Sequence, residues 1–258
     1  MRIIREPSVY LVGRQTTSEA DIARFLADHD VATWDTDSSA AGEKLCEMAG
    51  RMCYMSFAAP RPGGNAAYIE RLLSVAHGSV FEHATWNFIV TGVSRSFTHE
   101  LVRHRAGFGY SQLSQRYVDE SVADFVEPDC IAADAELHEV WRSAVERAQE
   151  AYVKLVTGLK HTFAHVEDKT LRRKMARQAA RSVLPNATET KIFITANARA
   201  LRHFIELRAN EHAETEIRKV ASMMCRMLQK EAPNLFGDYR LEPLPDGTLA
   251  ARTEYRKV

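Results

Sequence analysis

The chain has 258 residues, of which 45% are hydrophobic, and its 34 basic and 34 acidic residues give a formal net charge of zero. This length and composition allow a sizeable buried core, and the neutrality argues against a general nucleic-acid-binding protein. The first residues lack the apolar stretch of a secretory signal, and no run approaches the roughly 18 apolar residues of a membrane-spanning helix. Four cysteines without a CxxC pair predict neither a disulfide framework nor a zinc knuckle. We therefore expect a cytoplasmic protein with reduced thiols and no membrane partner.

The hydrophobic pattern along the chain predicts an α+β fold. Two-residue alternation predicts strands over Ser8–Val12, Thr85–Val93 and Lys191–Ala196. Apolar residues that recur every three or four positions predict helices over residues 137–159 and 217–228. Helices are also expected over residues 94–105, over the basic residues 168–184 before Pro185, and over residues 198–209 directly after the third strand. Pro60–Asn65 is expected to form a loop because it is rich in proline and glycine. We expect a central antiparallel sheet flanked by long helices, in a single domain of residues 1–258 whose tail after about residue 238 is extended.

Positive charge is concentrated in two segments of this neutral chain. Residues 95–116 hold four arginines against one glutamate, and residues 169–219 hold twelve basic residues against five glutamates. Locally convergent positive charge raises the concentration of phosphorylated ligands. Solvated helix faces give the same pattern in most proteins, so the charge alone leaves both an anion site and an ordinary surface open.

The segment from Glu100 to Tyr117, ELVRHRAGFGYSQLSQRY, contains the residues best suited to bind a ligand. Gly107 and Gly109 are expected to end the preceding helix and to let the backbone fold back toward a ligand. Arginine side chains match phosphate oxygens, and serine and glutamine side chains serve both donors and acceptors of a base or ribose. A salt-bridged surface turn has the same composition.

The spacing within this segment separates these alternatives. Arg103-His104-Arg105, eight residues, Ser114, one residue and Arg116 resemble the RHR-x(7 or 8)-S-x-R signature of the flavin-dependent thymidylate synthases. Residues 77–83, 172–190 and 197–218 also resemble segments of that family. The chain is therefore identified as a member of this family over most of residues 77–218. The resemblance implies the family's fold and its reaction, the methylation of dUMP to dTMP. It departs from many members in the Ala106-Gly107-Phe108-Gly109 stretch, which puts the placement of Gln112 in doubt.

The resemblance also implies the ligands and their binding residues. A reduced FAD supplies the hydride, 5,10-methylenetetrahydrofolate the carbon, and NADPH re-reduces the flavin. The positions that match FAD contacts are Ser79, Arg103, His104, Arg105, Gln112, Asn197, Ala198, Arg199 and His203. The positions that match dUMP contacts are Glu100, Leu101, Val102, Arg103, Gln112, Leu113, Ser114, Gln115, Arg116, Arg181 and Arg208.

Arg208 matches the catalytic position that ionises the pyrimidine. A guanidinium group stays charged at any working pH and stabilises the negative charge left when a ring nitrogen loses its proton. A helix-surface pair with Glu211 or His212 is the alternative that the residues alone favour.

Helix geometry adds a prediction about assembly. Arg199 and His203 share one face of a helix, whereas Arg208 lies nine residues after Arg199 and on the opposite side. Either the helix ends between them or its two faces serve different active sites. The second option agrees with the family's habit of building sites at the interfaces of a homotetramer, so we predict shared sites.

Several other residues invite functional interpretations. Ser114 is expected to bind substrate, because a nucleophilic serine needs an adjacent base that the sequence does not reveal. His77 is either an active-site residue or a core histidine. His161 and His165 lie four apart on an expected helix, but no third ligand is evident, so no metal site is predicted.

Two other classes of protein compete with the enzyme. A nucleic-acid-binding module is suggested by the basic residues 172–181, yet no aromatic stacking residues accompany them. A helical scaffold would explain the apolar stripes alone. We expect no nucleic-acid partner, and oxidation of NADPH stimulated by dUMP would distinguish the enzyme from both alternatives.

Overall fold

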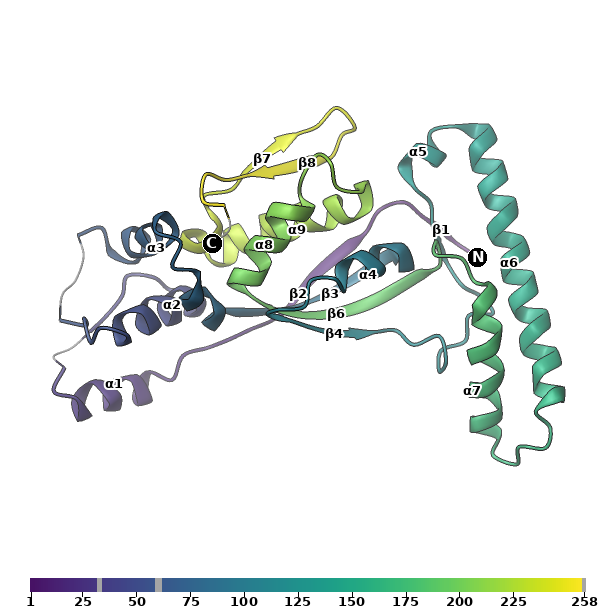
Figure 1. The fold of residues 1–258 in the computed structure, drawn as a ribbon, viewed down its shortest axis with the longest axis horizontal. Helices are drawn as coiled ribbons and strands as arrows, with labels where there is room; N and C mark the ends of the chain where they lie inside the picture. Colours follow the sequence, from purple (N-terminus) through teal and green to yellow (C-terminus); the bar gives the residue numbers. More distant parts are fainter. Residues whose placement is uncertain (32–33, 59–61, 257–258) are drawn as a thin grey trace. The chain divides into compact units, whose positions relative to one another are not determined.

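The computed structural model describes residues 1–31, 34–58 and 62–256 and combines helices with a central sheet (Figure 1). Its four strands lie in the order β2-β3-β6-β4, and their bounds are Ser8–Arg14, Thr85–Ser94, Glu189–Asn197 and Phe108–Gln112, respectively. The predicted α+β class is confirmed. The three predicted strands are also confirmed, each extended by one to three residues, and β4 was missed.

Adjacent strands of this sheet run antiparallel. The Asn197 N–H donates to the Gly107 carbonyl, and the Leu113 N–H donates to the Lys191 carbonyl. Between these two bonds the residue number falls along β6 from 197 to 191 and rises on the β4 side from 107 to 113, which is the register of an antiparallel pair. The same holds for β3 and β6, because Ala198 bonds to Ala84 whereas Arg95 bonds to Thr188. The predicted antiparallel sheet is therefore correct.

The chain divides into two compact units, each assembled from three separate stretches. Unit 1 comprises Met1–Ser8, Val90–Arg103 and Tyr110–Phe193, and unit 2 comprises Val9–Ile89, His104–Gly109 and Ile194–Val258. Strands β3, β4 and β6 each contribute residues to both units. A single domain of residues 1–258 stays a prediction.

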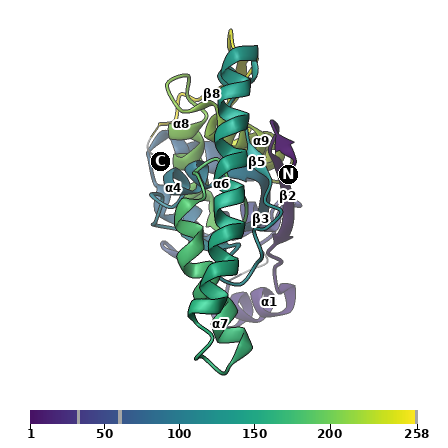
Figure 2. The same cartoon turned by 90° about the vertical axis from the view of Figure 1, so that its right-hand side faces the viewer.

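Unit 1 is dominated by a pair of helices that lie side by side in both views (Figure 2). The helices are α6, Ala135–Thr162, and α7, Lys169–Ala180, and each begins at an aspartate whose side chain accepts two backbone N–H bonds. Tyr152, Val156 and Ala180 form the buried seam between the two helices. The other elements of the unit are β1 Ile3–Ile4, α4 Arg95–Leu101, β5 Phe125–Val126, α5 Asp129–Ala132 and the 3-10 turn η2 Arg181–Val183. Strands β1 and β5 pair in parallel.

Unit 2 is mainly helical. Its helices are α1 Glu19–Asp28, α2 Ala41–Met52, α3 Gly64–Ser74, α8 Ala198–Arg208, α9 Thr215–Glu231, α10 Pro233–Phe236 and the 3-10 helix η1 Gly78–His83. Strands β7 Arg240–Pro243 and β8 Leu249–Arg252 form an antiparallel hairpin. The buried faces of α8 and α9 supply much of the core, including Phe204, Ile217 and Met224.

Two element predictions were wrong in part. The helix expected over residues 94–105 ends at Leu101, because the chain turns over residues 102–103 and leads into β4. The loop expected over Pro60–Asn65 ends sooner, because Gly64 already begins α3. Its residues 60–61 lie outside the described residues.

The tail after residue 238 is anchored by a buried ion pair. Arg202 of α8 is 2% exposed and donates to both carboxylate oxygens of Asp238 at 2.7 and 2.8 Å and to the Leu235 carbonyl at 2.6 Å. Asp238 also accepts a hydrogen bond from the hydroxyl of Thr253, beyond the hairpin. A buried guanidinium needs such a partner, because its desolvation is otherwise uncompensated. The extended tail is thus fixed at both ends of its hairpin.

We predict that Asp238→Asn lowers the free energy of unfolding by about 3–5 kcal/mol, the usual cost of removing one partner of a buried ion pair. Denaturant unfolding followed by circular dichroism measures this loss. The exposed Glu254→Gln is the control and should change stability by less than about 0.5 kcal/mol. Equal stability of the two variants would contradict the anchoring role.

Candidate functional site

The segment with the RHR spacing leaves α4 and turns sharply before β4. Arg103 and Arg105 are exposed, whereas His104 between them is buried. Gly107 has a φ of +73°, and a Cβ there would lie 2.7 Å from Nδ2 of Asn197 and 2.8 Å from Cβ of Ala200. Only glycine satisfies both constraints. The turn therefore brings Gly107 against the start of α8 and places His104 beside His203, Phe204 and Arg208, further along that helix.

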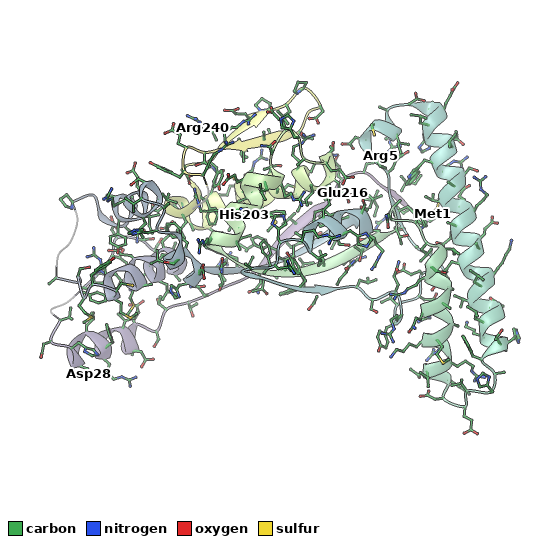
Figure 3. All side chains as sticks on the ribbon, viewed as in Figure 1. Met1, Arg5, Asp28, His203, Glu216 and Arg240 are labelled. Atoms are coloured by element: carbon green, nitrogen blue, oxygen red, sulfur yellow. The ribbon has the colours of Figure 1, made fainter. Side chains whose placement is uncertain are left out.

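His104 is the centre of a group of side chains in unit 2, which we call the imidazole cluster: His104, Phe108, His203, Phe204 and Arg208. The ring of His104 lies 5.2 Å from that of Phe204 and 5.9 Å from those of Phe108 and His203, measured between centroids. The contacts with His203 and Phe204 are edge-to-face and the contact with Phe108 is tilted, and such packing holds aromatic rings in one orientation. His104 is thus fixed, while His203 is exposed on α8 (Figure 3).

Arg208 joins the imidazole cluster from the last turn of α8. Its Nε donates to Nε2 of His104 at 3.0 Å. Because a guanidinium group only donates, Nε2 of His104 must accept, and the imidazole is neutral with its proton on Nδ1. The partly buried guanidinium group is therefore oriented by a residue of the RHR motif. Glu211, the partner that the residues alone favoured, pairs instead with Arg252 at 2.9 Å.

The other residues matched to FAD fall into two groups. Asn197 caps α8 by accepting the Ala200 N–H at 2.9 Å, and Ala198 is buried, so these two shape the helix start. Ser79 is exposed on η1, and Arg199 is exposed and paired with Glu82 at 2.6 Å. Glu82 was not predicted, and nothing in its sequence context singles it out.

The residues matched to dUMP in unit 1 are held by α4 and β4. Gln112 donates to the hydroxyls of Thr98 at 3.1 Å and Thr190 at 3.3 Å. Leu101 is fully buried, so only its backbone can face a ligand. Glu100, Val102 and Leu113 are at least partly exposed. Glu100 lies in the last turn of α4, whereas Arg103 and His104 follow its end at Leu101.

Ser114, Gln115 and Arg116 lie in the turn after β4. The Ser114 hydroxyl accepts the Arg116 N–H at 3.4 Å, and in the described part of the chain it has no other hydrogen bond. No base activates this hydroxyl there, which supports a binding role. Nε2 of Gln115 and Nε of Arg116 are enclosed without a hydrogen-bond partner among the described residues. Buried donors of this kind are costly unless a ligand, water or partner satisfies them.

Arg181 lies in η2 near a residue that the sequence did not single out, Arg95 at the start of α4. Burial lowers the pKa of Arg95, and the like charge of Arg181 lowers that pKa further. Glu120 acts in the opposite direction on the pKa of Arg95. We call Arg95, Glu120 and Arg181 the arginine cluster. Arg95 belongs to the basic segment 95–116, but it lies too far before the RHR motif for the spacing to reveal it.

The remaining histidine questions are answered in part. His77 is exposed beside η1, so it is not a core histidine, and it lines a pocket of about 520 Å³ with Arg51, Tyr54, Tyr68 and Arg71. His165 lies beyond the end of α6 at Thr162, so the expected pairing of His161 and His165 on one helix was wrong. Among residues 1–31, 34–58 and 62–256, no group of three or more His, Cys, Asp or Glu could hold a metal ion. None of the described helices is both long and apolar enough to span a bilayer.

The cysteines belong to neither the imidazole cluster nor the arginine cluster. Cys46 and Cys225 are fully buried, and burial raises the pKa of each thiol to about 12, with a nearby carboxylate adding to the rise. Cys53 and Cys130 are exposed. A thiol reacts as its thiolate, so the two buried cysteines are poor nucleophiles.

We predict that the exposed thiols of Cys53 and Cys130 react quickly with a disulfide reagent at pH 8. The buried thiols of Cys46 and Cys225 should react only after unfolding. Absorbance of the released thiolate measures both steps. A Cys53→Ser/Cys130→Ser double variant is the control and should lose the fast phase. Fast modification of Cys46 or Cys225 in the folded protein would contradict the buried environment.

Comparison with known proteins assigns this chain to a family. The sequence model of the family described as thymidylate synthase complementing protein matches residues 36–234. Flavin-dependent thymidylate synthases from Mycobacteroides abscessus and Mycolicibacterium vanbaalenii are 49% and 50% identical over 229 residues, which cover 88% of this chain and 90% of each relative. The chain belongs to the flavin-dependent thymidylate synthase family, and with it to the methyltransferases.

Solved structures agree with this assignment at the level of the fold. The UMP/dUMP methylase PolB from Streptomyces cacaoi, bound with 5-Br dUMP, superposes with a TM-score of 0.65 at 24% identity. The match covers 92% of this chain and 96% of that one. The same enzyme bound with 5-Br UMP gives a TM-score of 0.63. These matches show that both units belong to a fold shared with PolB.

Proposed function

We propose that this chain synthesises dTMP from dUMP, with 5,10-methylenetetrahydrofolate as carbon donor and NADPH as reductant of a bound FAD. In the balanced reaction, dUMP, methylenetetrahydrofolate, NADPH and a proton give dTMP, tetrahydrofolate and NADP⁺. Family membership over residues 36–234 supports the reaction. The hydrogen bond between Arg208 and His104 is the observation on which the proposal chiefly rests, because it joins the RHR motif to the proposed catalytic arginine.

The residues present suit FAD. When bound, FAD supplies the hydride. Arg105 is exposed and has no side-chain partner among the described residues, so its charge is available to a diphosphate. His203 presents an exposed ring beside His104, and Arg199 and Ser79 add polar groups in the same unit. We assign FAD binding to these residues together with Arg103, His104, Gln112, Asn197 and Ala198.

The residues assigned to dUMP suit a nucleotide. The guanidinium groups of Arg103, Arg116 and Arg181 match a phosphate, and Ser114 and Gln112 offer hydrogen bonds to the ribose or base. The enclosed donors of Gln115 and Arg116 lack partners in the described part of the chain, which is expected of a site that a ligand completes.

Arg208 is proposed to ionise the pyrimidine. Its positive charge stabilises the ring when the nitrogen between the two carbonyls loses its proton, and the electron density gained then activates the carbon that receives the methylene group. The bond to His104 fixes Nε and so limits how the guanidinium group can turn. Neutral His104 thereby positions Arg208 without competing for the charge.

We predict that Arg208→Gln lowers the rate of dTMP formation by about 100–1,000-fold, the effect of removing one donor that stabilises a developing charge. The protein should keep its flavin. Absorbance of bound flavin and chromatographic measurement of dTMP check the two outcomes. The exposed Arg240→Gln serves as the control (Figure 3) and should keep full activity.

The reaction itself is tested with the wild-type protein. Oxidation of NADPH should be stimulated by dUMP, and dTMP should form only when methylenetetrahydrofolate is added. A folded protein with neither bound flavin nor this activity would refute the proposed function.

We infer further that the enzyme is a cytoplasmic homotetramer with active sites at subunit interfaces. Helix α8 is continuous from Ala198 to Arg208, so it does not end between Arg199 and Arg208. The two arginines therefore lie on opposite sides of one helix. This supports the option in which its two faces serve different active sites.

We predict that mixing an inactive Arg199→Ala variant with an inactive Arg208→Gln variant restores part of the activity after subunit exchange. Mixed tetramers would contain some sites in which both arginines are intact. NADPH oxidation stimulated by dUMP measures the recovery, and two variants altered at Arg208 serve as the control pair. A mixture no more active than its components would count against shared sites.

A further inference from the structure

The joined ends of α6 and α7 border a cavity of about 590 Å³ in unit 1. The last turns of α6 and the first turns of α7 lie side by side there, next to the loop of residues 163–168 (Figure 2). Five of the lining residues are basic, namely Lys160, His161, Lys169, Arg172 and Arg173, and none of the described lining residues is acidic. A cavity of this volume falls in the range of small-molecule binding sites.

The positive charges around this cavity are not neutralised by their surroundings. The side chains of its two lysines and two arginines make no hydrogen bond or ion pair with any described residue. The nearest acids along the chain are Glu167 and Asp168, and neither lines the cavity. Asp168 is engaged in capping α7, where it accepts two backbone N–H bonds. Four cations therefore converge on one hollow without a counter-ion from the described part of the chain.

The stability of the helices explains only part of this arrangement. Lys160 and His161 lie in the last turn of α6, where a positive charge interacts favourably with the helix dipole. Lys169, Arg172 and Arg173 instead lie in the first turns of α7, which has no acidic residue in its first turn. Positive charge at a helix N-terminus opposes the dipole. An anion in the cavity would offset this repulsion, because it would face both the cations and the positive end of α7.

The lining also indicates what kind of anion fits. Lysine and arginine side chains only donate hydrogen bonds, so the ligand must offer several acceptor oxygens and several negative charges. A chain of phosphate groups has both properties, and lysine and arginine are the usual residues that bind phosphates. No Phe, Tyr or Trp is among the described lining residues, so the cavity has no ring on which a base could stack. A nucleic-acid strand, which relies on such stacking, fits it poorly.

We propose that the cavity between the ends of α6 and α7 binds a polyphosphate anion, supplied as inorganic triphosphate or as the phosphate chain of a nucleoside triphosphate. The cavity is separate from the residues assigned to dUMP, because Arg181 follows the opposite end of α7, about two helical turns beyond Arg173. The inference does not depend on the proposed synthesis of dTMP. The competing interpretation is an ordinary solvated basic face, which attracts anions weakly and without regard to where its charges lie.

The test is a calorimetric titration of the purified flavin-containing protein at about 0.15 M ionic strength, where interactions between distant surface charges are screened. Excess dUMP is present, so that the nucleotide site is occupied. Sodium triphosphate and ATP should bind with similar affinity, since no lining residue recognises a base. Lys160→Gln/Lys169→Gln removes one exposed charge from each helix and should weaken both ligands on the order of 10- to 100-fold, the range for losing hydrogen bonds to charged groups.

A matched control removes two charges from α6 away from the cavity. Arg147 and Lys154 are exposed and do not line it, so Arg147→Gln/Lys154→Gln changes the net charge equally and should leave both affinities within about twofold. Circular dichroism confirms that each variant is folded. If Lys160→Gln/Lys169→Gln fails to fold, the two single variants replace it, each with a smaller expected loss.

Several outcomes would overturn the inference. These are no binding of triphosphate by the wild type, an equal loss of affinity in the two double variants, and binding of ATP without binding of triphosphate. Size-exclusion chromatography tests a further occupant. Loss of the wild-type oligomeric state in Lys160→Gln/Lys169→Gln alone would show that a second copy of the chain fills the cavity. A protein that binds triphosphate as expected but forms no dTMP would refute the proposed function and leave this inference standing.

Discussion

The hydrogen bond from Arg208 to His104 connects the proposed catalytic arginine to the fold of this protein. His104 comes from the turn after α4, and Arg208 comes from the last turn of α8, more than 100 residues later. The bond requires that the RHR turn be pressed against α8, which in turn requires glycine at position 107 and the Asn197 cap. The guanidinium group of Arg208 and the neutral ring of His104 are thereby held in one orientation, which the proposed electrostatic role of Arg208 requires.

The sequence predicted those parts of the molecule that depend on local pattern or on fixed spacing. Alternating residues revealed β2, β3 and β6, and the three-and-four pattern revealed the long helices α6 and α9. The pattern could not reveal β4, because its sequence FGYSQ lies among glycines and polar residues and becomes a strand only by pairing with β6. The helix over residues 94–105 failed for the same reason, since tertiary pairing ends it early.

The site likewise contains residues that the sequence could predict and residues that it could not. Spacing identified the RHR turn and the residues after β4, but it carried no information about which of them face solvent. Leu101 proved to be buried, and Asn197 proved to shape a helix start. Arg95 and Glu120 were missed because the closeness of Arg95 to Glu120 and to Arg181 arises from the fold alone. A buried group without a partner is visible only when its three-dimensional surroundings are known.

The interleaving of the two units bears on how the protein is made. Unit 1 has all of its residues once the ribosome has added Phe193, although its stretches surround parts of unit 2. Unit 2 begins at Val9 but needs Ile194–Val258, which includes α8, α9 and the hairpin that Arg202 anchors. During synthesis its early helices therefore cannot bury all of their apolar faces until the last quarter of the chain has emerged. Unit 2 therefore begins near the N-terminus and is nevertheless the later of the two units to be completed.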